Sequence, residues 1–217
     1  MSVRSRSWIF ALGLALGACQ LADAAAPETA SILTRDECAA VPGYTAFRAR
    51  LEQVVAARDG TALRALFHPD GGMRVNGVGG HASTPDWGFD RPHAATVWAE
   101  LEQILDYGCV RDGDRLLLPA MAILTEDGSA APEQDMAIER FALRAAPDAE
   151  APVVRWVDPG ELVTVISSGE PEGWARLQIG GHDGFGRSDS LRSPHGFQLV
   201  LVPFNGGWRI REFTGGV

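Results

Sequence analysis

The residues best suited to hold a metal ion gather in one polar stretch, "GGHASTPDWGFDRPH". Imidazole and carboxylate groups ligate divalent cations, and this stretch supplies His81, Asp86, Asp90 and His93. Their spacing matches no metal-binding template, such as two ligands four residues apart on one helix. The glycines and prolines are typical of a solvated loop that leads into a capped helix. We therefore predict no metal site and no cofactor.

Catalytic motifs are absent from the sequence, which has no G-x-S-x-G, H-E-x-x-H, G-x-x-x-x-G-K or C-x-x-C. The isolated titratable residues have ordinary structural interpretations. We expect His68 to cap a helix end and His182 and His195 to lie in loops. Asp106 and Tyr107 are expected in the exposed last turn of a helix. We predict no catalytic residue, and we leave enzymatic activity open as the less favoured possibility.

Three aromatic residues, Trp156, Trp174 and Phe185, could line a binding groove. Aromatic platforms of this kind bind extended or proline-rich chains. Trp174 has a competing interpretation, because it begins a strand and a small barrel needs a large side chain in its core. These three residues are the predicted ligand-binding set.

The segment that carries these aromatics has the two-residue period of β-strands. From Met136 onward apolar and polar residues alternate, and "VVRWV", "ELVTVIS" and "GWARLQIGG" are each short and bounded by turn residues. This pattern predicts a small five-stranded β-barrel.

The same segment resembles the bacterial Src-homology-3-type domains over residues 136–193. "LRAAPDAEAPVV" is similar to their opening signature, and "GELVTVI", "GWARLQ" and "DGFGRSDSLRSP" follow in the expected order. The sequence departs from the pattern at Ala142, where Asn is usual, and at Phe185-Gly186, where Trp or Tyr followed by Val is usual. The resemblance implies a barrel with a peptide-binding groove.

Helices are predicted before this segment. Phe47, Leu51, Val54 and Val55 mark one face of an amphipathic helix that Gly60 should end. A short helix should follow and end at Pro69, with at most one strand through Met73, Val75 and Val78. The strongest helix has an apolar face and closes at Gly108. "RLLLPAMAILTEDGS" predicts a buried strand bent at Pro119. The members of that strongest apolar face are Trp98, Leu101, Ile104 and Leu105.

The C-terminal residues predict a β-hairpin around Asn205-Gly206. By simple alternation, Ile210 should face away from Phe213. The ending "GGWRIREF" and the early helices resemble the nuclear-transport-factor-2-like (SnoaL-like) family. That resemblance implies an α+β fold, with helices packed on a curved antiparallel sheet like a cone, and in some members a small-molecule pocket. Isomerase or dehydratase residues in such a pocket would be His68, His81 and Asp86.

We therefore predict an α+β domain formed by residues 44–135 plus 194–217, with the barrel of residues 136–193 inserted between its two halves. An insertion requires the last hairpin to pair with the strand predicted at 116–125. The alternative is two domains in series, with the hairpin merely extending the barrel.

The N-terminus has the pattern of a secretory leader over residues 1–24, followed by a linker at 25–43. Arg4 and Arg6 precede an apolar run at 8–18, and Ala22-Asp23-Ala24 offers a cleavage site. The run of 11 apolar residues is shorter than the roughly 20 that span a bilayer. An overlapping lipobox-like stretch ends at Cys19, which could instead carry a lipid. Both readings place the protein in the periplasm or as a lipoprotein anchored to the outer membrane of a bacterium.

Cys38 and Cys109 remain after the leader. An even count in an oxidising compartment predicts one disulfide; two free buried thiols are the alternative. A loop of that length is worth roughly 4 kcal/mol in the chain-entropy model.

The chain has a net charge of -9, which disfavours nucleic acid as a partner. We predict a non-enzymatic envelope protein whose barrel binds a peptide, a protein or a peptidoglycan component, with membrane contact only through a lipid anchor. The alternative is a small-molecule-binding, or lyase- or isomerase-type, cone domain.

Overall fold

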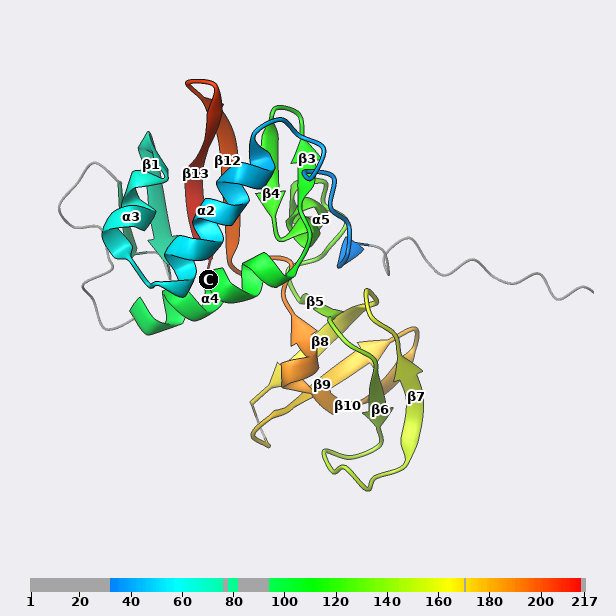
Figure 1. The fold of residues 1–217 in the computed structure, drawn as a ribbon. Coiled ribbons are helices and arrows are strands. Elements are labelled where there is room, and N and C mark those ends of the chain that lie inside the picture. Colours follow the sequence, from blue (N-terminus) through cyan, green and yellow to red (C-terminus); the bar gives the residue numbers. More distant parts are fainter. Residues whose placement is uncertain (1–31, 76–77, 82–93, 170, 216–217) are drawn as a thin grey trace, which may run out of the picture.

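The structure is a computed structural model that describes residues 32–75, 78–81, 94–169 and 171–215. The predicted leader, Cys19, Asp86, Asp90 and His93 lie outside these ranges. Within them, no helix combines the length and the apolar character needed to cross a membrane. The described chain is α+β, with two β-sheets that lie beside each other (Figure 1).

Three helices precede or interrupt the first sheet: α2 (Tyr44–Ala56), α3 (Gly60–Ala65) and α4 (Ala94–Asp106). The prediction that Gly60 ends the first of these helices was wrong. Helix α2 ends at Ala56, and Arg58 takes the left-handed conformation with φ 50°. Gly60 instead begins α3, where the Asp59 carboxylate accepts the Ala62 N–H at 2.9 Å as an N-cap. Helix α3 also ends before the predicted Pro69.

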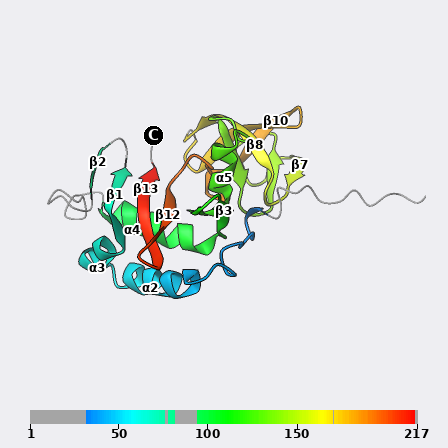
Figure 2. The ribbon, with the colours of Figure 1, turned by 90° about the horizontal axis from the view of Figure 1, so that it is seen from above.

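The first sheet has six strands and curls around the helices (Figure 2). Strand β1 runs parallel to β13, and the other pairs are antiparallel. The residues predicted as one strand near Met73 form two strands, β1 and β2. In spatial order the strands are β2 (Val78–His81), β1 (Phe67–Val75), β13 (Gly207–Gly215), β12 (Gln198–Phe204), β4 (Arg115–Leu118) and β3 (Val110–Asp112).

One hydrophobic core fills the space between the helices and the six-stranded sheet. Each large side chain buried there contributes on the order of 1.5–3 kcal/mol. The helices and the last hairpin are therefore held together by burial of their apolar faces. Fully buried members include Tyr44, Leu51, Leu101, Ile104, Leu199, Leu201, Ile210 and Phe213.

Phe213 corrects the predicted alternation of the last strand. Ile210 pairs with Leu201, but Glu212 pairs with Val200, so Arg211 is an extra residue in a bulge. The bulge resets the alternation, and Ile210 and Phe213 both face the core. The hairpin turn itself is as predicted, with φ 49° at Asn205 and 76° at Gly206.

The segment after Pro119 also corrects a prediction, because it is helical rather than a strand. It forms η1 (Ala120–Ala122) and α5 (Ile123–Glu126). Ala120 and Ala122 pack against Val200 on the sheet face opposite α2 and α4. A short run of alanine, methionine and leucine suits a buried helical turn as well as a buried strand.

The last hairpin pairs with β4, as the insertion prediction requires: Leu199 is opposite Leu118, and Leu201 is opposite Leu116. Between these two strands the chain forms a second sheet, here called the inserted sheet, which includes the turn η2 (Ser188–Ser190). Its strands in spatial order are β11 (Leu191–Arg192), β5 (Gln134–Ala137), β8 (Leu162–Ser168), β9 (Trp174–Ile179), β10 (His182–Arg187), β6 (Phe141–Arg144) and β7 (Val153–Val157).

The predicted five-stranded barrel is not confirmed in that form. The inserted sheet has seven strands, and its two outer strands, β11 and β7, are not paired with each other in the described chain. Its own core is built from inward-facing residues of five strands. These are Ala137, Phe141, Leu143, Val157, Val163, Ala175, Leu177 and Ile179.

A third apolar cluster joins the inserted sheet to η1 and α5. Met136 of the inserted sheet packs with Met121, Leu124 and the N-terminal residues Ile32 and Leu33. A polar contact accompanies it, as Arg192 on β11 donates to Glu100 at 3.3 Å and to Gln103 on α4. The Arg192 side chain is only 9% exposed, so this is a nearly buried contact. The inserted sheet is therefore packed against η1, α5 and α4 and not merely tethered to them.

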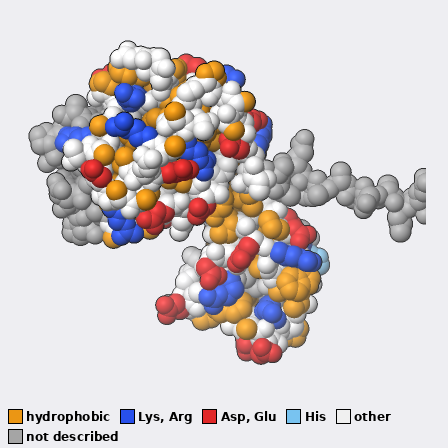
Figure 3. All heavy atoms as spheres, viewed as in Figure 1, with side chains coloured by type: hydrophobic (Ala, Val, Ile, Leu, Met, Phe, Trp, Pro, Cys, Tyr) orange, Lys and Arg blue, Asp and Glu red, His pale blue; other side chains and the backbone are white. Residues whose placement is uncertain are grey.

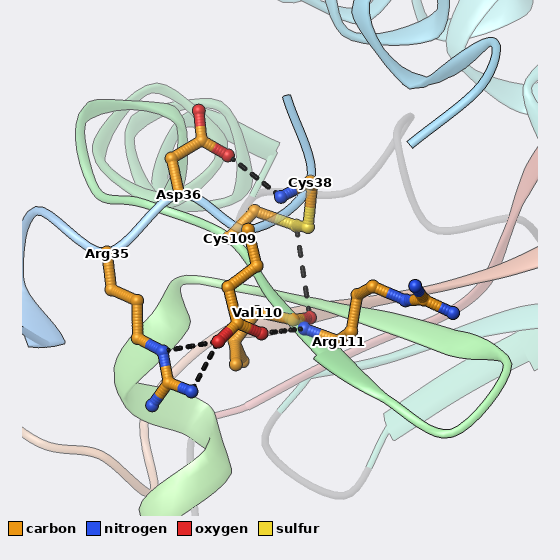
Figure 4. Close-up of polar contacts among 7 residues, drawn as sticks. Arg35, Asp36, Cys38, Cys109, Val110 and Arg111 are labelled. Atoms are coloured by element: carbon orange, nitrogen blue, oxygen red, sulfur yellow. Dashed lines mark hydrogen bonds and ion pairs between the residues drawn. A yellow bond between two sulfur atoms is a disulfide. The ribbon is translucent and has the colours of Figure 1, made fainter. Parts of the chain in front are cut away.

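Cys38 and Cys109 lie together, with 1.92 Å between the two sulfurs and 5.6 Å between the Cα atoms (Figure 4). This is the predicted pairing, and it ties the segment before α2 to the start of β3. The Glu37 N–H donates to the Cys109 carbonyl at 2.8 Å, and the Glu37 carboxylate accepts the Arg111 N–H at 3.0 Å. Both half-cystines are fully buried.

Candidate functional site

The three predicted aromatic residues share the outward face of the inserted sheet. Residues directly opposite each other in an antiparallel pair lie on one face, and neighbours along a strand alternate. Trp156 on β7 is opposite Ala142 on β6. Two residues further along β6, Arg144 is opposite Phe185 on β10. Two residues further along β10, Arg187 is opposite Trp174 on β9.

The alternate residues of the same strands face inward. Leu143, Ala175 and Leu177 are buried in the core of the inserted sheet, whereas Trp174 is only half-buried and is not part of that core. The interpretation of Trp174 as the core residue of the barrel was therefore wrong. Small and medium side chains fill the interior instead.

Two buried positions on β10, Gly184 and Gly186, leave no room for a side chain. A Cβ at Gly186 would lie 2.6 Å from Phe141 and 2.7 Å from Leu177. A Cβ at Gly184 would lie 2.7 Å from Leu143 and from the Arg144 carbonyl oxygen. The space that a larger residue would occupy at position 186 is thus taken by Phe141 and Leu177.

The outward aromatics differ in exposure. Trp156 is 53% exposed, whereas Trp174 and Phe185 are half-buried. The large hydrophobic side chains that are exposed in the described chain all belong to the inserted sheet, and three of the four are on β7. They are Val153, Val154, Trp156 and Ile166.

Each outward tryptophan has a guanidinium group over its ring. The Arg140 guanidinium lies 5.0 Å from the centre of the Trp156 ring, and Arg140 also pairs with Asp158 at 3.2 Å. The Arg187 guanidinium lies 5.6 Å from the centre of the Trp174 ring. Such contacts hold the indole and the cation in a fixed relation. Figure 3 shows hydrophobic and arginine side chains interspersed on this part of the molecule.

The arginines of this face also pair with acidic and carbonyl groups around it. Arg187 pairs with Asp189 at 3.2 Å, and its hydrogen bonds lower the pKa of the Asp189 carboxyl. Arg144 donates to the Ala151 carbonyl at 2.7 Å and thereby holds the loop between β6 and β7. The face can therefore offer flat apolar rings beside cationic donors, which suits ligands that carry both apolar groups and carboxylates.

Sequence reasoning missed Arg140 and Arg187 as members of this face. Arg187 could have been found, because it alternates with Phe185 along one strand. Arg140 precedes β6, and only the fold brings it over Trp156.

The other candidates lie elsewhere. His68 does not cap a helix; it lies in β1, where its ring meets Phe204 edge-on at 4.6 Å. Asp106 is exposed at the end of α4, as predicted. Tyr107 is instead half-buried in the cluster between the two sheets, where burial raises the pKa of its phenol.

Of the remaining histidines, His81 ends β2, where its backbone is opposite Gly72. His182 is the exposed first residue of β10 and pairs with Ile179, so the prediction that it lies in a loop was wrong. His195 lies between the sheets, with Nε2 3.3 Å from the Ala130 carbonyl oxygen. Among the described residues, no three His, Cys, Asp or Glu side chains are placed to hold a metal ion together.

No protein-family model matches the chain, and no curated protein matches it. Among solved structures, NlpC2 of Trichomonas vaginalis aligns with 27% of this chain and 22% of its own, at 19% identity and TM-score 0.26. NlpC1 of the same organism aligns at 20% identity and TM-score 0.26. The chain spans about a fifth of the length of these two proteins.

A protein of Shewanella frigidimarina described as a "putative ketosteroid isomerase" aligns with 79% of this chain and 92% of its own. Its identity is 9% and its TM-score 0.31. These likenesses are weak.

Proposed function

We propose that the protein is a non-enzymatic component of the bacterial cell envelope whose inserted sheet binds a peptide or a cell-wall component. The binding surface is the outward face that carries Trp156, Phe185 and Trp174. The observation that carries the proposal is the 53% exposure of Trp156 on β7. A tryptophan held in place by Arg140 yet largely open to solvent is suited to bury its area against a ligand.

The position of the exposed apolar groups supports this choice of surface. Exposed large hydrophobic residues scattered over a protein need no explanation, but a concentration of them marks an interaction site. In the described chain three of the four exposed large hydrophobic residues lie together on β7, the strand at the edge of the inserted sheet. The six-stranded sheet and its helices instead bury their large apolar groups in the common core.

The groups on this face favour a ligand with carboxylates and flat apolar surfaces. Arginine binds carboxylate through two parallel hydrogen bonds, and an indole stacks on peptide planes, proline rings or sugar faces. Peptidoglycan presents sugars and peptides with free carboxylates, so we propose it as the first ligand to test. The acidic chain, with net charge -9, disfavours nucleic acid.

The compartment is part of the proposal. The leader pattern of residues 1–24 and the pairing of Cys38 with Cys109 both support export to an oxidising compartment. We propose the periplasm, with membrane attachment only through a lipid on Cys19. Intact-mass analysis of the mature protein would distinguish cleavage after Ala24 from lipidation of Cys19.

A pull-down with purified peptidoglycan tests the binding function. Trp156→Ala should weaken binding by about 30-fold or more, since a buried aromatic anchor contributes roughly 2 kcal/mol or more. Ile166→Ala is the matched control, because Ile166 is 47% exposed on β8 of the same sheet but distant from β7 in strand order. Equal binding by the wild type and Trp156→Ala, with both folded by near-ultraviolet circular dichroism, would reject this surface.

The cone-type small-molecule or isomerase function is the second candidate from the sequence, and the geometry does not favour it. Its pocket would lie between the helices and the six-stranded sheet, where apolar side chains are closely packed. His68, one of its predicted residues, lies in β1 against Phe204 and Arg211.

A further inference from the structure

Two bulges meet where β1 runs beside β13. The register of β1 against β13 shifts between Phe67 and Gly72, and the bulge in β13 leaves Arg211 without a partner in β12. Bulges re-aim side chains and are frequent next to functional sites. A Cβ at Gly71 would lie 2.8 Å from the Ile210 carbonyl oxygen and 2.9 Å from that of Arg211, so the two backbones touch here.

His68 and Arg211 are brought together by this double bulge. The Arg211 Nη1 lies 3.3 Å from His68 Nδ1, and the Asp70 N–H lies 3.1 Å from the same nitrogen. Because a guanidinium and a backbone N–H can only donate, Nδ1 is the acceptor, and the ring proton is assigned to Nε2. His68 Nε2–H is thus a donor with no hydrogen-bond partner among the described residues.

Arg209 adds a second cation on the same face of the sheet. It is opposite Val202, on the face away from Leu201 and Ile210, which are in the core. Arg209 and Arg211 are both half-buried, and in the described ranges neither has a carboxylate within ion-pair distance. Arg209 donates to the Trp208 carbonyl at 2.9 Å.

This arrangement is unusual in a chain whose net charge is -9. A partly desolvated guanidinium without a counter-charge is unfavourable. The carboxylate beside His68 belongs to Asp70, whose side chain is 81% exposed and 3.9 Å from Nδ1. The described residues leave most of the donor capacity of the two guanidinium groups unused.

We propose that His68, Arg209 and Arg211 form a binding site for a small oxyanion, a phosphate or carboxylate group of a soluble ligand. Arg211 supplies paired N–H donors, His68 Nε2–H supplies a further donor, and Arg209 adds positive charge. The site belongs to the six-stranded sheet and is independent of the proposed ligand of the inserted sheet.

Inorganic phosphate and acetate, each titrated into the full mature protein at constant ionic strength, test the site. Binding is followed by the melting temperature and by the ¹⁵N resonances of the His68 ring. We expect a saturable rise in melting temperature and a shift of the Nε2 resonance, and the tighter of the two anions identifies the preferred group. Arg211→Gln should weaken binding by about tenfold or more, because hydrogen bonds to charged groups contribute roughly 1.5–3 kcal/mol.

Arg50→Gln is the matched control, since Arg50 is exposed on α2 and its loss should leave anion binding unchanged. If Arg211→Gln does not fold, His68→Gln serves in its place. The proposal is overturned if neither phosphate nor acetate shifts the His68 resonance. It is also overturned by a melting-temperature rise that follows ionic strength alone, or by one that is the same in wild type and Arg211→Gln.

Discussion

Leu199, in the hairpin near the end of the chain, pairs with Leu118, which ends the strand before the inserted sheet begins. The strands β5 to β11, which lie between Leu118 and Leu199 in the sequence, all belong to the inserted sheet. The chain therefore leaves the six-stranded sheet at one strand and returns to the neighbouring position. We propose the corresponding division into one domain of residues 44–135 plus 194–217 and an inserted one of residues 136–193.

Removing the Cys38–Cys109 link should destabilise the six-stranded part. The link closes a loop of 71 residues, for which the chain-entropy model gives about 4 kcal/mol. Cys38→Ala with Cys109→Ala should therefore lower the free energy of unfolding by roughly that amount. Urea unfolding of this variant, and of the wild type with and without reductant, measures it; equal stability of all three samples would show that the link is not formed.

Gly186→Ala should destabilise the inserted sheet by about 1–3 kcal/mol, the usual cost of overpacking. Its Cβ would lie 2.6 Å from the Phe141 ring and 2.7 Å from Leu177. Gly207→Ala is the control, since a Cβ there would meet only the Phe204 carbonyl oxygen at 3.9 Å. Thermal unfolding of both variants measures the difference, and a Gly186→Ala protein as stable as Gly207→Ala would contradict the packing described for Phe141.

Arg192→Met should loosen the contact between the two sheets. It removes the bond to Glu100 and the contact of the guanidinium with the Tyr107 ring at 5.4 Å. Glu100 would then be left partly buried without a partner, so we expect a loss of about 2–3 kcal/mol. Faster amide exchange in α4 and near Tyr107 is the direct readout. Arg192→Lys should not restore protection, because lysine cannot bond Glu100 and Gln103 through one planar group.

Local sequence signals predicted much of this fold. The Asn205-Gly206 turn and the alternation in "WARLQI" depend on residues within a few positions, and the structure has them as expected. "VVRWV" is a strand as predicted, but its burial does not alternate, because the register with β6 skips Val154. The shared outward face of Trp156 and Phe185 follows once the strands are paired. The pairing of the last hairpin with β4 agrees with what the proposed insertion requires.

The errors came from features that no local pattern carries. "GGWRIREF" alternates regularly, yet the bulge at Arg211 puts Phe213 in the core beside Ile210, and the bulge is defined only by the register with β1 and β12. The run after Pro119 is too short to distinguish a buried strand from a helical turn. The stacking of Arg140 on Trp156 depends on the long-range path of the chain.

Stability should depend on pH through Asp135, which lies where β5 leaves the six-stranded part. Burial raises the pKa of the Asp135 carboxyl, while a hydrogen bond with Ser193 and the charge of His195 act in the opposite direction. Because the folded protein holds this proton more tightly, the group stabilises the fold below its ordinary pKa of 3.8. That contribution is lost as pH rises through the raised pKa of the folded state.

Asp135→Asn cannot ionise and should escape this loss. The stability of the variant minus that of the wild type, from urea unfolding at a series of pH values, should therefore increase as pH rises from about 3.5 to about 7. Glu37→Gln should show the opposite trend, because the Arg111 N–H and Arg35 lower the pKa of Glu37. Its deficit should be present at neutral pH and shrink on acidification. Parallel curves for Asp135→Asn and the wild type would show that Asp135 is not desolvated at the junction of the two sheets.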